Sequence, residues 1–333
     1  MLVPFVIDAD SLIPDPSWTP AIARSCHYDL LEVWERIGLL VHDGEQFESS
    51  NLARAVERLP QNLKLLWQAM LKRSPPVPCP NDWGGSVTSG AVSDICAVAS
   101  AALVDDTRAE AEFGLTEGQD EIALAESGAH SLAICRLIAA NHARVFKHAI
   151  ETSVGHIEVG ESYQAIWNLR FRPLAYAPLK NISIVDRYAV EQHFRCPRQW
   201  LSGLERFLRL LDDDAIGVRY VSLFSAWTPK LKAKSLVDIE SELSAVLQRL
   251  QKKSIKRLKV HMIPDSVFRT DARDRFVRFG HYVWDLGHGL DVFEGPTAAK
   301  RCSASFKTDA ATYERVEKDL ERNIKPCDLL ILR

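Results

Sequence analysis

The sequence has no uncharged apolar run of about 18 residues, the length a helix needs to cross a membrane. The longest candidate, Ser86 to Val104, is interrupted by Asp94 and contains several serines. At the amino end the chain passes from Met1 into an apolar stretch with no basic leader, so we expect no signal peptide. These absences predict a cytoplasmic protein without a transmembrane segment.

Paired-cysteine motifs are also missing. The seven cysteines form no CxxC pair and none has the histidine spacing of a zinc site, which indicates buried thiols in a reducing compartment. The sequence contains no Walker-type loop and no GxGxxG, HExxH or GxSxG motif. Nucleotide hydrolysis, zinc proteolysis and serine hydrolysis therefore have no support.

The length and the charge distribution of the sequence are informative about its domains and ligands. A chain of 333 residues favours two domains, and its 47% hydrophobic and 26% charged residues are typical of a globular protein. Residues 1–150 hold 20 acidic and 11 basic residues, a net charge of −9, whereas residues 151–333 hold 24 and 30, a net charge of +6. The first half thus suits a cation and the second an anion.

Hydrophobic periodicity predicts alternating strands and helices in both halves. A proline- and glycine-rich stretch at 74–91 interrupts the first half and indicates a loop, either a lid or an insertion. We expect two α/β domains with largely parallel or mixed sheets, one spanning 1–154 and the other 155–333. The expected strands are 2–7, 132–140, 181–185, 218–224, 258–263, 276–279 and 282–286, and the expected helices are 29–40, 51–72, 92–104, 117–127, 142–150, 163–179 (kinked at Pro173), 203–211, 238–252 and 312–324.

The most informative stretch runs from 272 to 293. It resembles the phospholipase D-like C-terminal domain that follows the MIT domain in some membrane-trafficking proteins, and the resemblance extends over roughly 156–325. The residues that carry it are Asp274, Arg275, Trp284, Gly287, Gly289, Leu290, Asp291 and Phe293. The resemblance implies a phospholipase D-like fold, binding of anionic lipid and homodimerisation.

Phospholipase D-type catalysis needs a histidine nucleophile and a lysine two residues later. Here those two positions hold Arg273 and Arg275, and an arginine cannot act as the nucleophile because it keeps its proton. His261, His281 and His288 have no lysine at the required spacing. We therefore expect the second half to be catalytically silent.

Arginine forks match the geometry of phosphate, and alternate residues of a strand share one face. The second half is therefore predicted to bind a polyanion, either nucleic acid or anionic lipid. The phosphate-binding candidates are Arg273, Arg275, Arg278, Lys300, Arg301, and the run 252–259 with Lys252, Lys253, Lys256 and Arg257. For Gly287, Gly289 and Asp291 we expect a structural role. The glycines should form a tight turn, and Asp291 should accept hydrogen bonds from backbone N–H groups there.

The first half is similar to a PIN-like nuclease domain, which also begins with a buried strand ending in an aspartate. This resemblance implies carboxylates that hold Mg²⁺ or Mn²⁺ for phosphodiester cleavage. The expected catalytic residues are Asp8, Asp10, Glu32 and Asp120, with Ser11, Glu35 and Asp94 as alternatives. Asp8 and Asp120 are the expected metal ligands, within about 6 Å of each other. Asn141 stands where the family has a further carboxylate.

Two functions follow from these patterns. The first is a metal-dependent nuclease domain coupled to a non-catalytic polyanion-binding domain, as in a bacterial defence or toxin-type system. The alternative is a non-catalytic adaptor that docks on an anionic membrane or on a protein partner.

Overall fold

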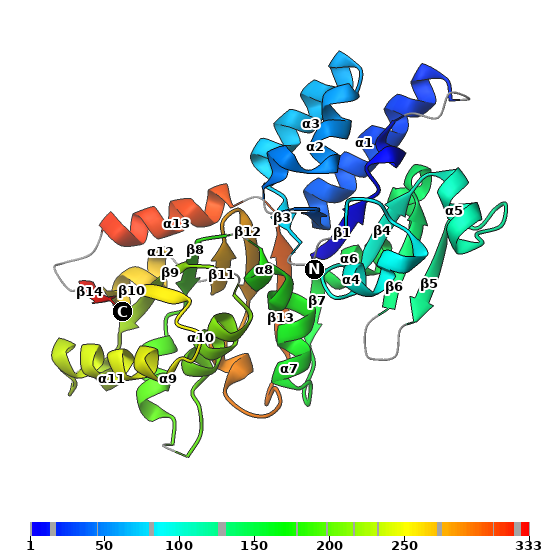
Figure 1. Ribbon diagram of the computed structural model, residues 1–333. Coiled ribbons are helices and arrows are strands. Elements are labelled where there is room, and N and C mark those ends of the chain that lie inside the picture. Colours follow the sequence, from blue (N-terminus) through cyan, green and yellow to red (C-terminus); the bar gives the residue numbers. More distant parts are fainter. Residues whose placement is uncertain are drawn as a thin grey trace. The chain divides into compact units, whose positions relative to one another are not determined.

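The chain forms two compact units, 1–152 and 153–333, each built around its own sheet (Figure 1). This computed structural model describes residues 2–13, 18–44, 46–79, 83–125, 131–177, 179–197, 199–215, 217–231, 233–271, 275–308, 310–322 and 328–332. Both sheets mix parallel and antiparallel strands, which confirms the predicted architecture of two α/β domains. The division lies close to the predicted boundary at 154/155. We call the two parts unit 1 and unit 2.

Unit 1 has a six-stranded sheet in the order β3-β2-β1-β4-β6-β5. All its neighbours are parallel except β5, which pairs antiparallel with β6 at one edge. The strands are β1 (Val3–Ile7), β2 (Gly38–His42), β3 (Val77–Pro78), β4 (Ala101–Val104), β5 (Glu121–Ala125) and β6 (Ser131–Arg136). The helices are α1 (Pro20–Ile37), α2 (Asn51–Arg58), α3 (Gln61–Arg73), α4 (Val92–Cys96), α5 (Asp106–Phe113) and α6 (Arg144–Thr152), with short turns η1 (Asp10–Leu12), η2 (Phe47–Ser49), η3 (Ser89–Ala91) and η4 (Leu137–His142).

Both faces of this sheet are covered, because residues that alternate along β1 belong to different cores. Phe5 packs with Trp34 of α1 and Phe146 of α6 on one face. Val6 packs with Ile95 of α4 and other buried residues on the opposite face. Central strands buried on both sides read as continuous apolar runs, which is why β1 is recognisable in the sequence.

Several predicted elements of unit 1 are wrong. Residues 117–127 are expected as a helix, but 121–125 form the edge strand β5, because pairing with β6 overrides the helix propensity of alanine and leucine. The predicted helix 92–104 is α4 followed by β4, and the strand expected at 132–140 ends at Arg136. The helix expected at 29–40 gives way to β2 at Gly38, and Pro60 divides the helix expected at 51–72.

Unit 2 has an eight-stranded sheet in the order β14-β10-β9-β8-β11-β12-β13-β7, in which β8, β9 and β10 are parallel and the other pairs are antiparallel. The strands are β7 (Val154–Ile157), β8 (Asn181–Val185), β9 (Arg219–Trp227), β10 (Ile255–Pro264), β11 (Phe276–Phe279), β12 (Tyr282–Leu286), β13 (Cys302–Lys307) and β14 (Asp328–Leu332). The helices are α7 (Tyr163–Ile166), η5 (Trp167–Phe171), α8 (Arg172–Tyr176), α9 (Ala189–Arg195), α10 (Gly203–Asp214), η6 (Pro229–Leu231), α11 (Leu236–Arg249), α12 (Asp265–Asp271), η7 (Gly289–Phe293) and α13 (Ala311–Arg322).

An aromatic cluster forms one core of unit 2. Phe171 contacts Trp167, Phe207, Trp284 and Phe293, with ring centroids 5.5–6.0 Å apart. These rings come from η5, α10, β12 and η7, so the cluster fixes η7 against the helices. The helix predicted at 163–179 is interrupted by the π-helical turn η5, and Pro173 lies in the first turn of α8.

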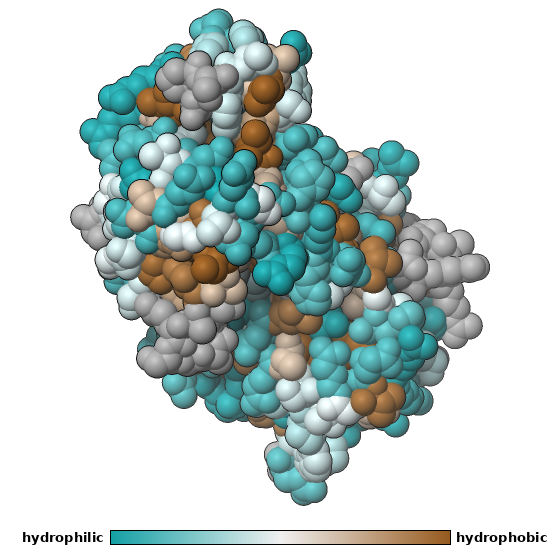
Figure 2. All heavy atoms as spheres, turned by 90° about the vertical axis from the view of Figure 1, so that its right-hand side faces the viewer, coloured by the Kyte–Doolittle hydropathy of each residue, from teal (hydrophilic) through white to brown (hydrophobic). Residues whose placement is uncertain are grey.

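The predicted strands of unit 2 are confirmed with small shifts at their ends, and residues 276–279 and 282–286 form the expected hairpin. No helix in the described ranges is long and apolar enough to cross a membrane. Hydrophilic residues dominate the face drawn in Figure 2, and hydrophobic residues occur there in small separate patches.

Candidate functional site

Asp8 follows β1 at the carboxyl end of the unit 1 sheet, where α/β proteins place polar sites. Its side chain is fully buried. Oδ2 accepts a hydrogen bond from Ser11 Oγ at 2.9 Å and lies 2.8 Å from Nε of Arg108, and Oδ1 accepts one from the N–H of Val87 at 3.3 Å. Burial raises the pKa of Asp8 to about 6, against the lowering effect of Arg108. Both oxygens of this carboxylate are therefore already engaged by protein groups.

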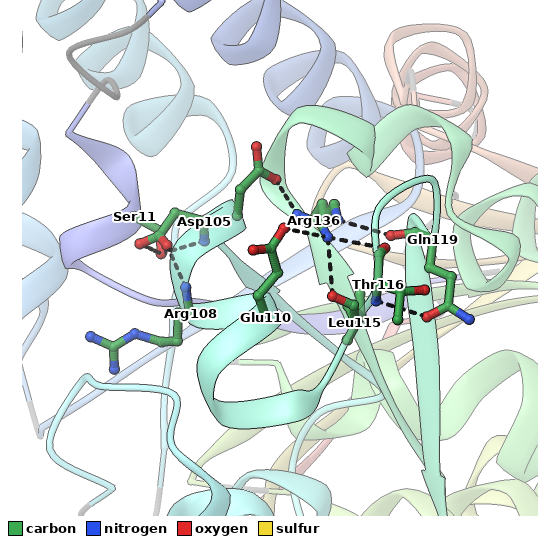
Figure 3. A network of polar contacts seen from close by, with 9 residues as sticks. Ser11, Asp105, Arg108, Glu110, Leu115, Thr116, Gln119 and Arg136 are labelled. Atoms are coloured by element: carbon green, nitrogen blue, oxygen red, sulfur yellow. Dashed lines mark hydrogen bonds and ion pairs between the residues drawn. The ribbon is translucent and has the colours of Figure 1, made fainter.

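Ser11 links Asp8 to a second carboxylate, that of Asp105 at the end of β4. Ser11 Oγ lies 3.1 Å from Asp105 Oδ2 and accepts a hydrogen bond from the N–H of Asp105 at 2.7 Å. Asp105 also caps α5 by accepting the N–H of Arg108 at 2.7 Å, as Figure 3 shows. Asp105 was not predicted because residues 92–104 were expected to form a helix. The run Ala101–Val104 before two aspartates is the signal for a strand that ends there.

A second arginine lies at the same edge of the sheet, at the end of β6. Arg136 is buried and lies 2.8 Å from Asp106 Oδ1 and 3.3 Å from Glu110 Oε1. Its guanidinium also donates to three carbonyls, including Gln119 O at 2.8 Å (Figure 3). The residue that ends this strand is thus a cation, where the PIN resemblance implies an anion, and Asn141 lies further on in η4.

The structure does not bring Asp8 and Asp120 together, so the expected approach within about 6 Å is wrong. Asp120 is exposed and directly precedes β5, which is separated from β1 by β4 and β6. Three strand spacings correspond to roughly 14 Å. The prediction fails because it placed Asp120 at the start of a helix beside the central strands, whereas 121–125 form the antiparallel edge strand.

The other expected carboxylates are also apart from Asp8 or occupied. Asp10 is exposed, and its Oδ2 lies 3.6 Å from Arg108. Glu32 is on the outer surface of α1, where it pairs with Arg36. The alternatives lie elsewhere too: Glu35 pairs with Arg73, and Asp94 is exposed in α4.

These residues do not fit a divalent cation in this arrangement. A Mg²⁺ or Mn²⁺ site needs several oxygen ligands that converge on one point. Arg108 already supplies the positive charge at Asp8, and Arg136 supplies it at Asp106. Across the parts of the chain that are described, no group of three or more histidine, cysteine, aspartate or glutamate side chains is placed to hold a metal ion.

The loop predicted as a lid or insertion crosses this edge of the sheet. Gly85 O accepts the N–H of Ala9 at 3.2 Å, and Gly84 O accepts the Asn51 side-chain amide at 2.8 Å. Arg108 donates to Ser86 Oγ and to Val87 O. Gly85 has φ +73°, and a Cβ there would lie 2.9 Å from Cγ of Asp43, the residue after β2. The loop therefore covers the ends of β1 and β2.

In unit 2 the corresponding buried carboxylate is Asp186, which follows β8. It accepts the backbone N–H of Leu290 at 2.8 Å and of Tyr188 at 3.0 Å. Burial raises its pKa, and the nearby charge of Arg275 opposes that shift. Gly289 has φ +60°, and a Cβ there would lie 2.1 Å from Asp186 Oδ2. The expected structural turn is present, but its acceptor is Asp186 rather than Asp291.

Three of the predicted phosphate-binding arginines already have partners in the protein. Arg278 lies 2.7 Å from Glu317 Oε1 and 3.3 Å from Glu314 Oε1 of α13, so this prediction is wrong. Arg301 pairs with Glu158 on the surface. Arg275 stacks over the Tyr188 ring at 4.9 Å and faces Asp186. Arg273 lies outside the described residues, and Lys300 is exposed at the rim of a pocket described below.

The basic run 252–259 divides into two parts. Backbone N–H groups of Lys252, Lys253, Ser254 and Ile255 surround the buried carboxylate of Asp212, at 2.6–3.4 Å. The side chain of Lys252 donates to the carbonyl of Asp213, in the acidic end of α10. This first part is a turn held by Asp212, and acidic neighbours offset much of its charge.

The second part of the run enters β10 and has no such neighbours. Lys256 and Arg257 are exposed, and neither has an ion pair among the described residues. Arg257 is the register partner of Tyr220 on β9, and its guanidinium lies 4.9 Å over that ring. Tyr220 was not predicted, although its half-exposed position between buried Arg219 and Val221 follows the two-residue alternation of a strand.

Comparisons with known proteins add little to this geometry. No protein family and no curated protein matches the chain. Among solved structures, a match is TrmBL2, described as an archaeal chromatin protein that shows a novel mode of DNA binding. The identity is 13%, the TM-score is 0.26, and the match covers 52% of this chain and about half (54%) of that one. A TM-score this low carries no argument about fold or function.

Proposed function

We propose that this protein is a non-catalytic nucleic-acid-binding protein, and that it holds single-stranded nucleic acid on the sheet of unit 2 beside Tyr220 and Arg257. The observation that carries the proposal is the stacked pair that these two side chains form on neighbouring strands. Bases stack on aromatic rings and on guanidinium planes alike, so the pair offers a platform for an unpaired base.

Two exposed lysines lie close to the pair along the backbone. Lys256 directly precedes Arg257 in the chain. Lys180 directly precedes β8, and its carbonyl accepts the N–H of Tyr220 at 2.8 Å. The region thus combines a stacked pair with positive charge, the combination that single-stranded nucleic acid requires.

The absence of catalysis in the proposal rests on the chemistry of the two units. In unit 1 the cation beside Asp8 is Arg108, and a guanidinium does not supply an activated water as a bound metal would. In unit 2 the sequence lacks the histidine–lysine pair of phospholipase D chemistry. We favour nucleic acid over an anionic membrane because the Tyr220–Arg257 pair offers flat ring and guanidinium faces on which an unpaired base can stack.

Fluorescence anisotropy with a labelled single-stranded oligonucleotide over a salt series tests the proposal. The double variant Lys256→Glu/Arg257→Glu should weaken binding and reduce the slope of log K against log[salt] by roughly 1–2. Tyr220→Leu should weaken binding by about 1–3 kcal/mol with an unchanged slope, since stacking releases no counterions. The control is Lys72→Glu/Lys147→Glu, which makes the same change in net charge at exposed positions of unit 1.

Two results would contradict the proposal. One is an affinity for nucleic acid that the three unit 2 substitutions leave unchanged while the control weakens it. The other is tighter binding to phosphatidylserine vesicles than to any oligonucleotide, with Tyr220→Leu without effect, which would favour the membrane adaptor instead.

A further inference from the structure

Unit 2 contains a pocket of about 400 Å³ that neither the stacked pair nor the buried carboxylates use. Its walls come from the segment after α9 and from residues 288–300, which include η7 and the chain that follows it. The volume falls in the range of small-molecule sites and is ample for a long side chain. Pockets of this kind bind by apolar contact and use a few polar groups to select the ligand.

The pocket has an aromatic wall. Trp200 lines it and is 49% exposed, an unusual position for a large indole. The apolar lining includes Val292, Ala298 and Ala299. Among aromatic side chains, the indole of tryptophan attracts cations most strongly through its quadrupole.

The pocket also has two carboxylates. Asp291 in η7 and Glu294 just after it both line the cavity, and neither forms an ion pair with a described residue. Asp291 accepts a hydrogen bond from Gln192. The positive charge of Arg275 acts on both Asp291 and Asp186. Lys300 and His288 line the pocket too, but Lys300 is exposed at its rim.

We propose that this pocket binds a cationic group, a guanidinium or an ammonium, which lies against Trp200 and is paired by Asp291 and Glu294. Such a group is carried by the arginine and lysine side chains of a protein partner and by free amines. The proposal is independent of nucleic-acid binding, because none of the pocket residues belongs to β8, β9 or β10.

The pocket should respond to pH. Burial and the neighbouring carboxylates Asp186 and Glu294 raise the pKa of Asp291 to about 6, and Arg275 and Gln192 oppose the shift. Asp291 is therefore charged above this pH and neutral below it, so affinity for a cation should fall as pH falls through about 6. His288 also lines the pocket, so an Asp291 variant is needed to assign the pH dependence to Asp291.

Isothermal titration calorimetry on the full chain with N-acetyl-arginine amide, and with its neutral analogue N-acetyl-citrulline amide, tests the proposal. The arginine compound should bind and the citrulline compound should bind at least tenfold more weakly. Trp200→Leu should reduce affinity by about 3–30-fold. Asp291→Asn should reduce it at pH 7.5 and remove most of the loss between pH 7.5 and 5.

The matched control is Glu240→Gln, which removes one charge from the exposed surface of α11 and should leave binding unchanged. A parallel titration with ethanolamine and with an arginine-containing peptide identifies the source: comparable affinities indicate a free amine, and much tighter binding of the peptide indicates a protein partner. Equal binding of the arginine and citrulline compounds would overturn the proposal, as would normal affinity in folded Trp200→Leu and Asp291→Asn proteins.

Discussion

Each unit places a buried aspartate at the end of a parallel strand, and in each the aspartate holds a glycine-containing segment against the sheet. In unit 1 Asp8 accepts the N–H of Val87 in the loop that crosses the sheet edge. In unit 2 Asp186 accepts the N–H of Leu290 in the turn that begins η7. The difference is in what surrounds them: Arg108 bonds Asp8 directly, whereas Arg275 acts on Asp186 through space.

In both units, therefore, the aspartate that follows a buried strand holds a loop in place, a structural role that the sequence pattern alone does not reveal. In unit 2 a pocket lies beside this attachment and is lined partly by residues of η7. In unit 1 the loop continues across β1 and β2.

Substitution of the glycines that approach the two aspartates should have the largest effect on stability. Gly289→Ala forces a Cβ to 2.1 Å from Asp186 at φ +60°, so we expect a loss of roughly 3 kcal/mol or more in unfolding free energy, measured by urea denaturation. Gly85→Ala should be milder, because its closest contacts, with Asn51 Cβ and Nδ2 at 2.8 Å, are less tight. Gly160→Ala, at φ +88° with open space, isolates backbone strain at about 1 kcal/mol.

The next largest effect concerns the direct ion pair of unit 1. Arg108→Met leaves the buried carboxylate of Asp8 without its cation, and we expect a loss of about 2–3 kcal/mol at pH 7.5. The folded-state pKa of Asp8 lies above its unfolded value, so folding takes up a proton as pH falls. The loss should therefore shrink toward pH 5, and Asp8→Asn/Arg108→Met should recover most of the stability. A loss that does not change with pH would show that Arg108 acts by packing alone.

The smallest expected effect concerns how the stability of unit 2 depends on pH. The pKa of Asp291 is raised to about 6 from an ordinary value of 3.8, so its charged form destabilises the fold above that pH and its protonation stabilises it below. Thermal melts of Asp291→Asn should show a gain of about 1–2 kcal/mol at pH 7.5, allowing for solvent screening, and a flatter profile between pH 4 and 6. An unchanged profile would mean that Asp291 is well solvated.

The sequence was sufficient for the elements whose pattern is local. β1 is a continuous apolar run, the hairpin of β11 and β12 has its glycine at the turn, and these were predicted correctly. What failed depends on partners distant in sequence. Residues 121–125 have helix-forming alanine and leucine, and only pairing with β6 makes them a strand.

The same distinction applies to the site. Asp8 was predicted because it follows a recognisable strand. Its neighbours Asp105 and Arg108 were not, because they follow β4, a strand of only four residues that was expected to be part of a helix. Arg278 was expected to bind phosphate because a guanidinium fork matches phosphate geometry. The sequence does not show that α13 places Glu314 and Glu317 beside it. Charge counts thus overstate a binding surface until the internal pairs are known.

The position of β7 has a consequence for how unit 2 folds. This strand lies at one edge of the sheet. Its partner among the described strands is β13, and most of the sequence of unit 2 lies between the two. Contacts so remote in sequence make folding slow, because a long loop must close before they form. During synthesis the backbone of β7 has no strand partner until β13 has been made, whereas all of unit 1 is already available to fold. Chaperone dependence of newly made chains should therefore originate in unit 2.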